Sequence, residues 1–452
     1  MTPENNKQGS VILPTLLIVM ILVASGATYL TMSFNEFKMA NRNQNLQKAI
    51  NLAEAGVEKA MLAMKNDSWS GWTTVATDNY YISDPINIGF ANGTTGSYKT
   101  YVNFVDASAP IVFSEGTVTS QYGNTKKQIR IDFGVSGLFM NGLTAKKNIS
   151  WSGNNVLVDS YNSNNGSYDP NNPNDNGSVA SMSVTAGDVS IGNGDIFGYV
   201  ATGGGAPSFG PNGSLKGKDT PNGVSIDTSR IAYDFYSDFP DVPQPSTSSS
   251  TAIPASGTIG NPSATYPTEF YTTSFSNKNN DTLVVDGPVR FIVDGGWTSK
   301  GEIQVTSNGS VELYITGDLD IGGNGIVNSD GIPADFVIYG TNSVEGGQTI
   351  KMHGNGALYA AVYAPNAHIE MKGGGNSGTF MGAAVGYTVT MTGNSNFHYD
   401  EALKEFGGDG SYRIERWREL IDSDEKIPMD VPSEIIQYAV HYNTKSDFTQ
   451  SS

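Results

Sequence analysis

The chain opens with a long apolar segment and then changes to the pattern of an amphipathic helix. No charged side chain occurs from Ser10 to Met32, which is long enough to cross a hydrocarbon core about 30 Å thick. No proline interrupts residues 15–84, so one helix of about 80 Å is predicted over residues 10–65. Its second half carries an apolar stripe at three- and four-residue steps, formed by Leu46, Ile50, Ala53, Val57, Met61 and Met64.

Residues 66–137 alternate between apolar and polar positions, which predicts strands. Tyr98, Thr100, Val102 and Phe104 share one face, and Lys99, Tyr101 and Asn103 share the other. Turns are predicted at Gly116 and at Tyr122-Gly123-Asn124. We therefore expect a small antiparallel meander packed on the second half of the helix.

The larger part of the chain contains an internal repeat that opens with an apolar residue, any residue, methionine, any residue and glycine. Copies begin at Ile350, Ile369 and Val389, with spacings of 19 and 20 residues. Such a period predicts a β-solenoid with two short strands per coil and Gly or Asn at the corners. A β-sandwich is the main alternative. Related segments begin at Ile149, Val189 and Leu319.

These patterns predict a β-rich α+β protein with several parts. The solenoid is expected in two portions, residues 138–202 and 283–400. Residues 203–282 interrupt it, either as an insertion that projects from one face or as a flexible linker. In residues 401–452 we expect a C-terminal helix, which caps the open end, followed by a polar tail.

Composition narrows the function classes. The chain has 53 glycines, no cysteine and a net charge of −18. Excess acidic charge argues against nucleic acid as a partner. Absence of cysteine excludes disulfides and thiolate sites, and the balance of residues is typical of a β-rich extracytoplasmic protein.

A catalytic site is not indicated by the aligned repeats. They place Lys351 over Glu370 over Thr390, and His353 over Lys372 over Thr392, as ordinary solvent-facing rows. Asp318 and Asp320 lie near a corner, but no second acidic pair aligns with them. We therefore expect no enzymatic activity and no cofactor, although other β-solenoids act on polysaccharides.

Metal binding is not indicated either. The four histidines, His353, His368, His398 and His441, lack ligand spacing. The segment 169–176 offers oxygen ligands suited to calcium but lacks the glutamate of an EF-hand loop. A solvated Asn-rich turn is favoured there, and calcium binding is left open.

The N-terminal segment allows three interpretations. It could be a cleaved secretory signal with a small-residue site near Ala24-Ser25-Gly26-Ala27, or a plain uncleaved anchor. Third, Gly9 before the apolar helix, with NLAEAGVEKAM beyond it, resembles the leader and helix of type IV prepilins. The phrase around Leu52-Ala53-Glu54-Ala55-Gly56 is most similar to the PilX-like pilus assembly proteins, a group of minor pilins.

The resemblance implies that residues 1–9 are a leader, that a prepilin peptidase cleaves after Gly9, and that the new N-terminal residue, Ser10, is methylated. Major pilins of this family carry a glutamate five residues into the mature chain, the position occupied here by Pro14. That carboxylate is thought to pair with the charged N-terminus of a neighbouring subunit, because a carboxylate within a membrane helix needs a partner. A subunit without it fits the filament tip, which has no neighbour ahead. Proline is tolerated in the first helical turn.

The leading hypothesis is a non-enzymatic minor pilin-like subunit of a type IV pilus or related filament. It would sit in the bacterial inner membrane, join other pilin-like subunits through its helix, and display the solenoid at the cell surface for assembly or for adhesion to a surface or polysaccharide ligand. The alternatives are a membrane-anchored envelope protein outside any filament and an anchored carbohydrate-active solenoid.

Overall fold

A computed structural model describes residues 12–429, except 75–78, 91–92, 108, 122, 136, 248, 250, 323–324, 355–356, 374–377, 408–411 and 422–424. The chain divides into two compact units. The first contains Met1–Val135 and Gly410–Ser452, and the second contains Ser136–Asp409.

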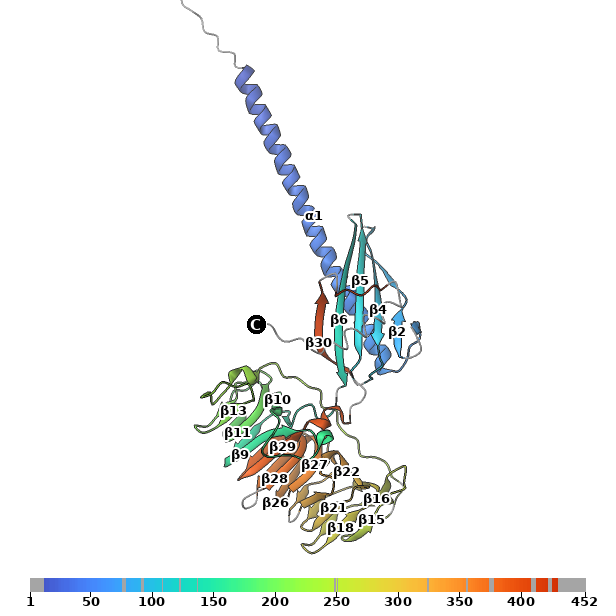
Figure 1. Ribbon diagram of the computed structural model, residues 1–452, viewed down its shortest axis with the longest axis vertical. Helices are drawn as coiled ribbons and strands as arrows, with labels where there is room; N and C mark the ends of the chain where they lie inside the picture. The colour runs from blue at the N-terminus through green and yellow to red at the C-terminus, as the bar shows by residue number, and fades with distance from the viewer. Residues whose placement is uncertain are drawn as a thin grey trace, which may run out of the picture. The chain divides into compact units, whose positions relative to one another are not determined.

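The first unit is one long helix packed on an antiparallel sheet, as the sequence predicts (Figure 1). Helix α1 spans Ile12–Lys65, so its predicted end is correct. The sheet has the order β1-β2-β4-β5-β6-β30, with β3 beside β4. Its strands are β1 (Trp72–Thr74), β2 (Tyr80–Ser83), β3 (Ile86–Gly89), β4 (Thr95–Asn103), β5 (Ile111–Ser120), β6 (Gly123–Val135) and β30 (Tyr412–Leu420).

Small residues bring α1 against the sheet. Ala49, Ala53 and Ala60 are fully buried, so the contact stripe is rotated from the predicted one toward the smaller side chains. A Cβ atom on Gly56 would lie 2.3 Å from the hydroxyls of both Thr100 and Ser114. The glycine of the NLAEAG segment therefore permits close approach of helix and sheet.

Gly116 serves the same contact from the sheet side. The turn predicted at Gly116 is wrong, because this glycine lies inside β5. A Cβ atom there would lie 1.9 Å from the carbonyl oxygen of Ala49. Glycine in a strand interior often marks such a close backbone approach.

On the other face of the sheet, described residues near the end of the chain pack against the strands. Tyr101 packs there with Leu420, Ile427 and Met429. The side-chain amide of Gln128 donates to the Ile427 carbonyl at 2.8 Å and accepts from the Ile427 amide at 2.9 Å.

The C-terminal helix predicted in residues 401–452 is wrong in the described part. Residues Glu401–Glu405 form a short 3₁₀ turn, η5, and Tyr412–Leu420 form strand β30. Strand β30 pairs antiparallel with β6, opposite Gln128–Val135. Pairing with an existing strand outweighs local helix preference, because it satisfies the backbone groups of β30 along one side.

We predict that Gly116→Ala destabilises the first unit by about 1–3 kcal/mol, since two backbones must separate to admit the methyl group. Thermal unfolding and amide exchange in β5 measure the effect. Gly89→Ala is the matched control, because nothing lies within 4 Å of the added Cβ atom. Equal stability of the two variants would contradict the close contact.

The second unit is a parallel β-solenoid whose side chains fill one continuous core. The predicted stacking of repeats is confirmed: Leu319, Ile350, Ile369, Val389, Ile149 and Val189 follow one another in register. Each full coil has three strands rather than the two predicted. The segment Leu358–Tyr363 turns a corner at Ala360, so it contributes to two faces.

The strands stack in three ladders. The first consists of β16 (Thr268–Thr272), β19 (Pro288–Val293), β22 (Ser310–Ile315), β25 (Phe336–Gly340), β27 (Ala357–Gly373), β28 (Gly378–Thr392), β7 (Leu143–Ala145), β10 (Gly177–Ser181), β11 (Val189–Thr202) and β14 (Ile231–Ala232). The second consists of β17 (Phe275–Asn277), β20 (Trp297–Ser299), β23 (Leu319–Ile321), β26 (Gln348–Gly354), β27, β28, β8 (Ile149–Ser152), β11 and β12 (Ser208–Phe209). The third ladder has two parts. One is a four-stranded sheet of β15 (Gly257–Ile259), β18 (Thr282–Val285), β21 (Glu302–Val305) and β24 (Gly325–Asn328). Strand β24 lies next to β27, from which pairing continues through β28, β29 (Ser395–Asp400), β9 (Asn154–Tyr161), β11 and β13 (Ser214–Lys216).

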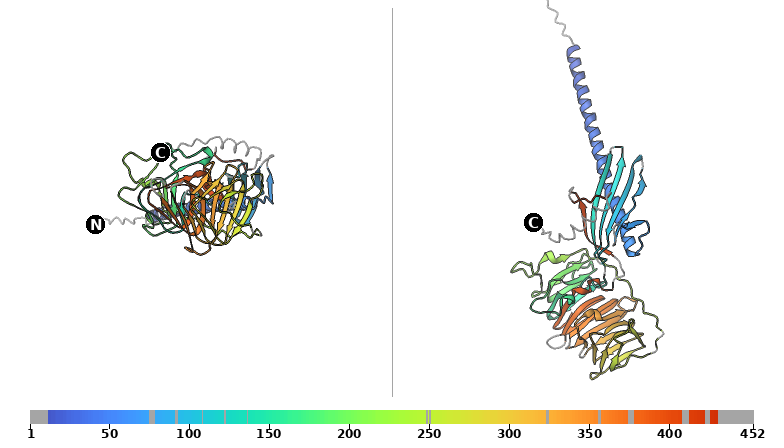
Figure 2. Two further views of the ribbon diagram at one scale, coloured as in Figure 1. Left: turned by 90° about the horizontal axis from the view of Figure 1, so that it is seen from below. Right: turned by 45° about the vertical axis from the view of Figure 1, so that its right-hand side comes forward.

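The order of the coils in space differs from their order in the chain. The first coil, with Ile149–Ser152, pairs with the last, through Val389–Thr392. In Figures 1 and 2 the red and orange strands therefore lie in the middle, between green strands at one end and yellow strands at the other. The chain enters and leaves the solenoid at the same place, where the amide of Leu138 donates to the carbonyl of Phe406 at 3.0 Å.

Residues 233–256, here called the strap, connect the two ends of the solenoid. The strap contacts the coils in turn. The backbone amide of Phe235 donates to the Thr202 carbonyl, the Tyr363 hydroxyl donates to the Pro240 carbonyl, and the backbone amide of Tyr271 donates to the Thr251 carbonyl. Ile253 is buried in the core. Strands β15 and β16 already belong to the solenoid. Residues 203–282 are therefore neither a projecting insertion nor a linker between two halves: β12–β14 and β15–β17 are solenoid strands, and the strap between them runs along the coils.

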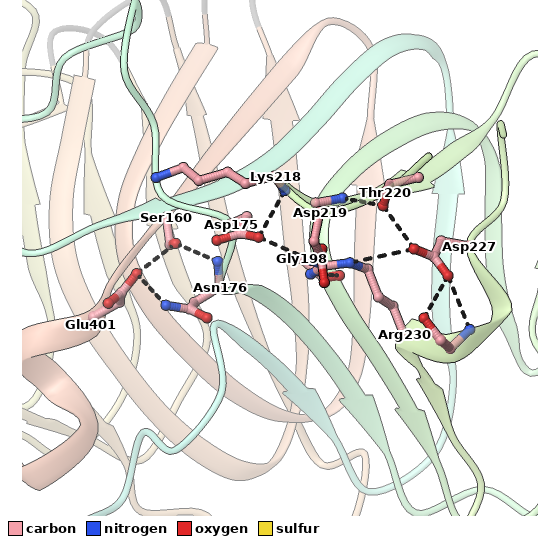
Figure 3. A network of polar contacts seen from close by, with 12 residues as sticks. Ser160, Asp175, Asn176, Gly198, Lys218, Asp219, Thr220, Asp227, Arg230 and Glu401 are labelled. Atoms are coloured by element: carbon pink, nitrogen blue, oxygen red, sulfur yellow. Dashed lines mark hydrogen bonds and ion pairs between the residues drawn. The ribbon is translucent and has the colours of Figure 1, made fainter. Parts of the chain in front are cut away.

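A buried arginine closes the green end of the solenoid (Figure 3). The side chain of Arg230 is 3 % exposed, and it binds Asp175 at 3.0 Å, Asp219, and the Gly198 carbonyl at 3.3 Å. Burial alone would raise the pKa of Asp175, but the Lys218 amide and the charge of Arg230 lower it below its usual value. The network joins the Asn-rich loop, which contains Asp175, to the terminal coils.

Candidate functional site

The first half of α1, residues 12–35, here called the apolar half, presents bare hydrophobic surface. Its large side chains from Ile12 to Val23 are all at least 55 % exposed. Among the described residues, α1 is the one helix long and apolar enough to cross a membrane. Such a surface requires lipid or a protein partner to cover it.

Three threonine hydroxyls of the apolar half are satisfied within the helix. The hydroxyls of Thr15, Thr28 and Thr31 donate to the carbonyls of Ile12, Ala24 and Ala27 at 2.8–2.9 Å. An unsatisfied hydroxyl would be costly in an apolar environment. The apolar half therefore suits a setting that excludes water.

The helix changes character at Glu36, its first charged residue. Beyond it, the ammonium of Lys38 lies 4.6 Å from the ring centroid of Phe34. From Asn45 onward the helix buries one face against the sheet. One continuous helix thus joins an exposed apolar segment to a folded head.

Of the predicted site residues, Pro14 lies within the described part of the chain. Gly9 and Ser10 fall outside the described residues, so the predicted cleavage and methylation are untested. Pro14 lies in the first turn of α1 and is exposed. Its missing amide leaves no helical hydrogen bond unmade at that position.

The rows predicted on the solenoid surface form as expected. Lys351 is paired with Glu370, which is paired with Thr390 on the next coil, and the Lys351 ammonium is 3.8 Å from the Glu370 carboxylate. Both side chains are about half exposed, so this ion pair adds little stability. The structure also pairs His353 with Asp320 at 2.7 Å on the surface.

The other titratable residues singled out in the sequence are dispersed. Asp169 caps its own turn by accepting from the Asn171 amide at 2.9 Å, whereas Asp175 binds Arg230. His441 lies outside the described residues. No group of three His, Asp or Glu side chains that could hold a metal ion occurs in the part of the chain that the structure describes.

Sequence reasoning missed the roles of Gly116, Arg230 and the strap. Gly116 carries the signal of a glycine within a strand pattern, which permits either a turn or a close approach. Arg230 is preceded by Asp219 and Asp227, but its third partner, Asp175, is distant in the chain.

Part of the chain matches a described protein family. Residues 250–406 match a family described as "Domain of unknown function (DUF7305)". No curated protein matches the chain. Among solved structures, the chain is similar to the competence-associated pilin ComZ from Thermus thermophilus, at 12 % identity over 84 % of this chain and 98 % of that chain. The TM-score of 0.21 is too low to establish a shared fold.

Proposed function

We propose that this protein is a non-enzymatic, minor pilin-like subunit of a type IV pilus or a related filament. The division of α1 carries the proposal. Its apolar half is exposed and its threonine hydroxyls bond within the helix, while its second half packs closely on an antiparallel sheet at Gly56 and Gly116. The apolar half of α1 suits an environment of lipid or of other helices, and the second half attaches the folded sheet to it.

Two surroundings can cover the apolar half in succession. Before assembly, the uncharged segment would span the bacterial inner membrane. After assembly, the same surface would pack against the helices of other pilin-like subunits, which replaces lipid contacts by protein contacts. Prepilin peptidase would cleave after Gly9 and expose Ser10 as the new N-terminus.

Pro14 supports a position at the filament tip. A proline cannot form the ion pair that a glutamate at this position would offer to a neighbouring N-terminus. A subunit at the tip has no neighbour ahead of it, so it does not need this ion pair and can carry proline instead of glutamate. The solenoid would then be displayed outside the cell for assembly or adhesion, with a surface or polysaccharide as its ligand.

Mass spectrometry of the mature N-terminus tests the pilin-like processing. We expect a chain that begins at Ser10 and carries a methyl group on its α-amine. A Gly9→Val variant should stay uncleaved, because a larger side chain at the cleavage site disrupts recognition.

An intact Met1 in the wild-type protein would instead support a membrane-anchored envelope protein outside any filament. Cleavage near Ala27 would support a secretory signal. Either result contradicts the proposal.

Pro14→Glu tests the position at the tip. The added carboxylate should let the subunit pair with neighbouring N-termini, so labelled protein should spread along the filament shaft. Immunogold microscopy of filaments measures its distribution, with Pro14→Ala as the control that removes proline without adding charge. If Pro14→Glu stays where the wild type is found, the argument from the missing carboxylate is wrong.

A further inference from the structure

A groove of about 520 Å³ lies on the outer face of the third ladder. Its floor is formed by neighbouring strands of the solenoid, and the Asn-rich loop after β9 forms a wall with Tyr168, Pro170 and Pro173. This volume falls in the range of small-molecule sites, about 300–1,000 Å³. The residues that line the groove, from Leu157 to His398, are far in sequence from the apolar half of α1.

The floor combines apolar surface with a few polar groups from separate coils. One row runs through Thr379, Asn396, Leu157, Asp195 and Ser214, each paired in register with the next. The adjacent row contains Met381, His398 and Asp159, paired in the same way. Phe197 and Lys216 also line the groove.

A buried polar triad lies at the wall. His398 Nδ1 bonds Asp159 Oδ1, and the side chains are only 5 % and 2 % exposed. The hydroxyl of Tyr168 donates to Asp159 Oδ2 at 2.6 Å. Burial, followed by this hydrogen bond, raises the pKa of Tyr168 and keeps it a donor. The Tyr168 ring also lies 3.8 Å from the His398 ring, centroid to centroid.

This triad holds the His398 ring at the edge of the groove. Its Nδ1 is bonded to Asp159, so Nε2 is the ring nitrogen left to meet a ligand. A ligand hydroxyl can donate a hydrogen bond to an imidazole nitrogen or accept one from it, so it can bond Nε2 in either tautomer.

The charges and backbone of the groove exclude other ligand classes. Asp159 and Asp195 outnumber Lys216, which disfavours phosphate and acidic polymers. Strands β28, β29, β9 and β11 are hydrogen-bonded to a strand on each side, so an added peptide strand cannot pair with them. What remains is a neutral ligand with apolar faces and many hydroxyls.

We infer that this groove binds a neutral oligosaccharide. Phe197 and Leu157 contact the apolar face of a sugar ring, while Asn396, Asp195 and His398 Nε2 bond its hydroxyls. The inference rests on the proposed display role and deepens it, because it gives the displayed solenoid a ligand class and a location for it.

Titration calorimetry of the detergent-solubilised full chain tests the site with cellotetraose, maltotetraose and chitotetraose as probes. At least one should bind, and Phe197→Ala and Asn396→Ala should each weaken it about five- to tenfold through lost stacking or hydrogen bonding. Tyr236→Ala is the control, since Tyr236 is an aromatic on the strap that is 84 % exposed and outside the groove. Unchanged thermal unfolding shows that the variants fold.

Failure of all three sugars to bind at millimolar concentration would overturn the inference, as would wild-type affinity in both groove variants. Equal loss of affinity in Tyr236→Ala would also overturn it, because binding would then lie elsewhere. The assay requires no filament. A chain correctly processed at Ser10 that binds no sugar thus refutes the groove alone, and a sugar-binding chain with intact Met1 refutes the pilin-like role alone.

Discussion

The pairing of the first coil with the last is the constraint on which the second unit depends. Strand β8 lies in register with β28 on one face, and β9 lies in register with β29 on another. Without these contacts, each of the two solenoid portions would expose an open strand edge at the place where they now meet. An exposed edge is a liability for any sheet, because it can pair with another chain. Each coil is stabilised mainly by its neighbours, so this junction makes two portions into one core.

The junction also explains how the solenoid is attached. Because the outermost coils come from the middle of the sequence, the strap must return along the coils, and the two chain ends emerge together beside Leu138 and Phe406. In the first unit the corresponding positions, Val135 and Tyr412, are also paired. The solenoid is therefore an insertion between two adjacent strands, β6 and β30. Such an arrangement leaves the helix–sheet core complete and suits the display of a large module.

The sequence predicted those features of the fold that depend on interactions within a short segment. The extent of α1, the faces of β4 and the register of the repeats from Ile350 to Thr392 were predictable, because each depends on periodicity within a short segment. The coil order, strand β30 and the groove were not. Asp159 and His398 meet only because β9 pairs with β29, and the residues of β30 have no strand pattern that would overrule a helix without β6 beside them. The sequence around each of these residues gives no indication of the distant strand with which it pairs.

A disulfide across the junction tests this account most directly, since the natural chain has no cysteine. Ser150 and Thr390 are paired in register, with their hydroxyls 3.4 Å apart, and neighbouring strands bring Cα atoms within the usual disulfide range of about 4.4–6.8 Å. The double variant Ser150→Cys/Thr390→Cys should oxidise within one chain as readily as the control Glu370→Cys/Thr390→Cys, whose coils are consecutive. Cross-linking of the control alone would contradict the junction.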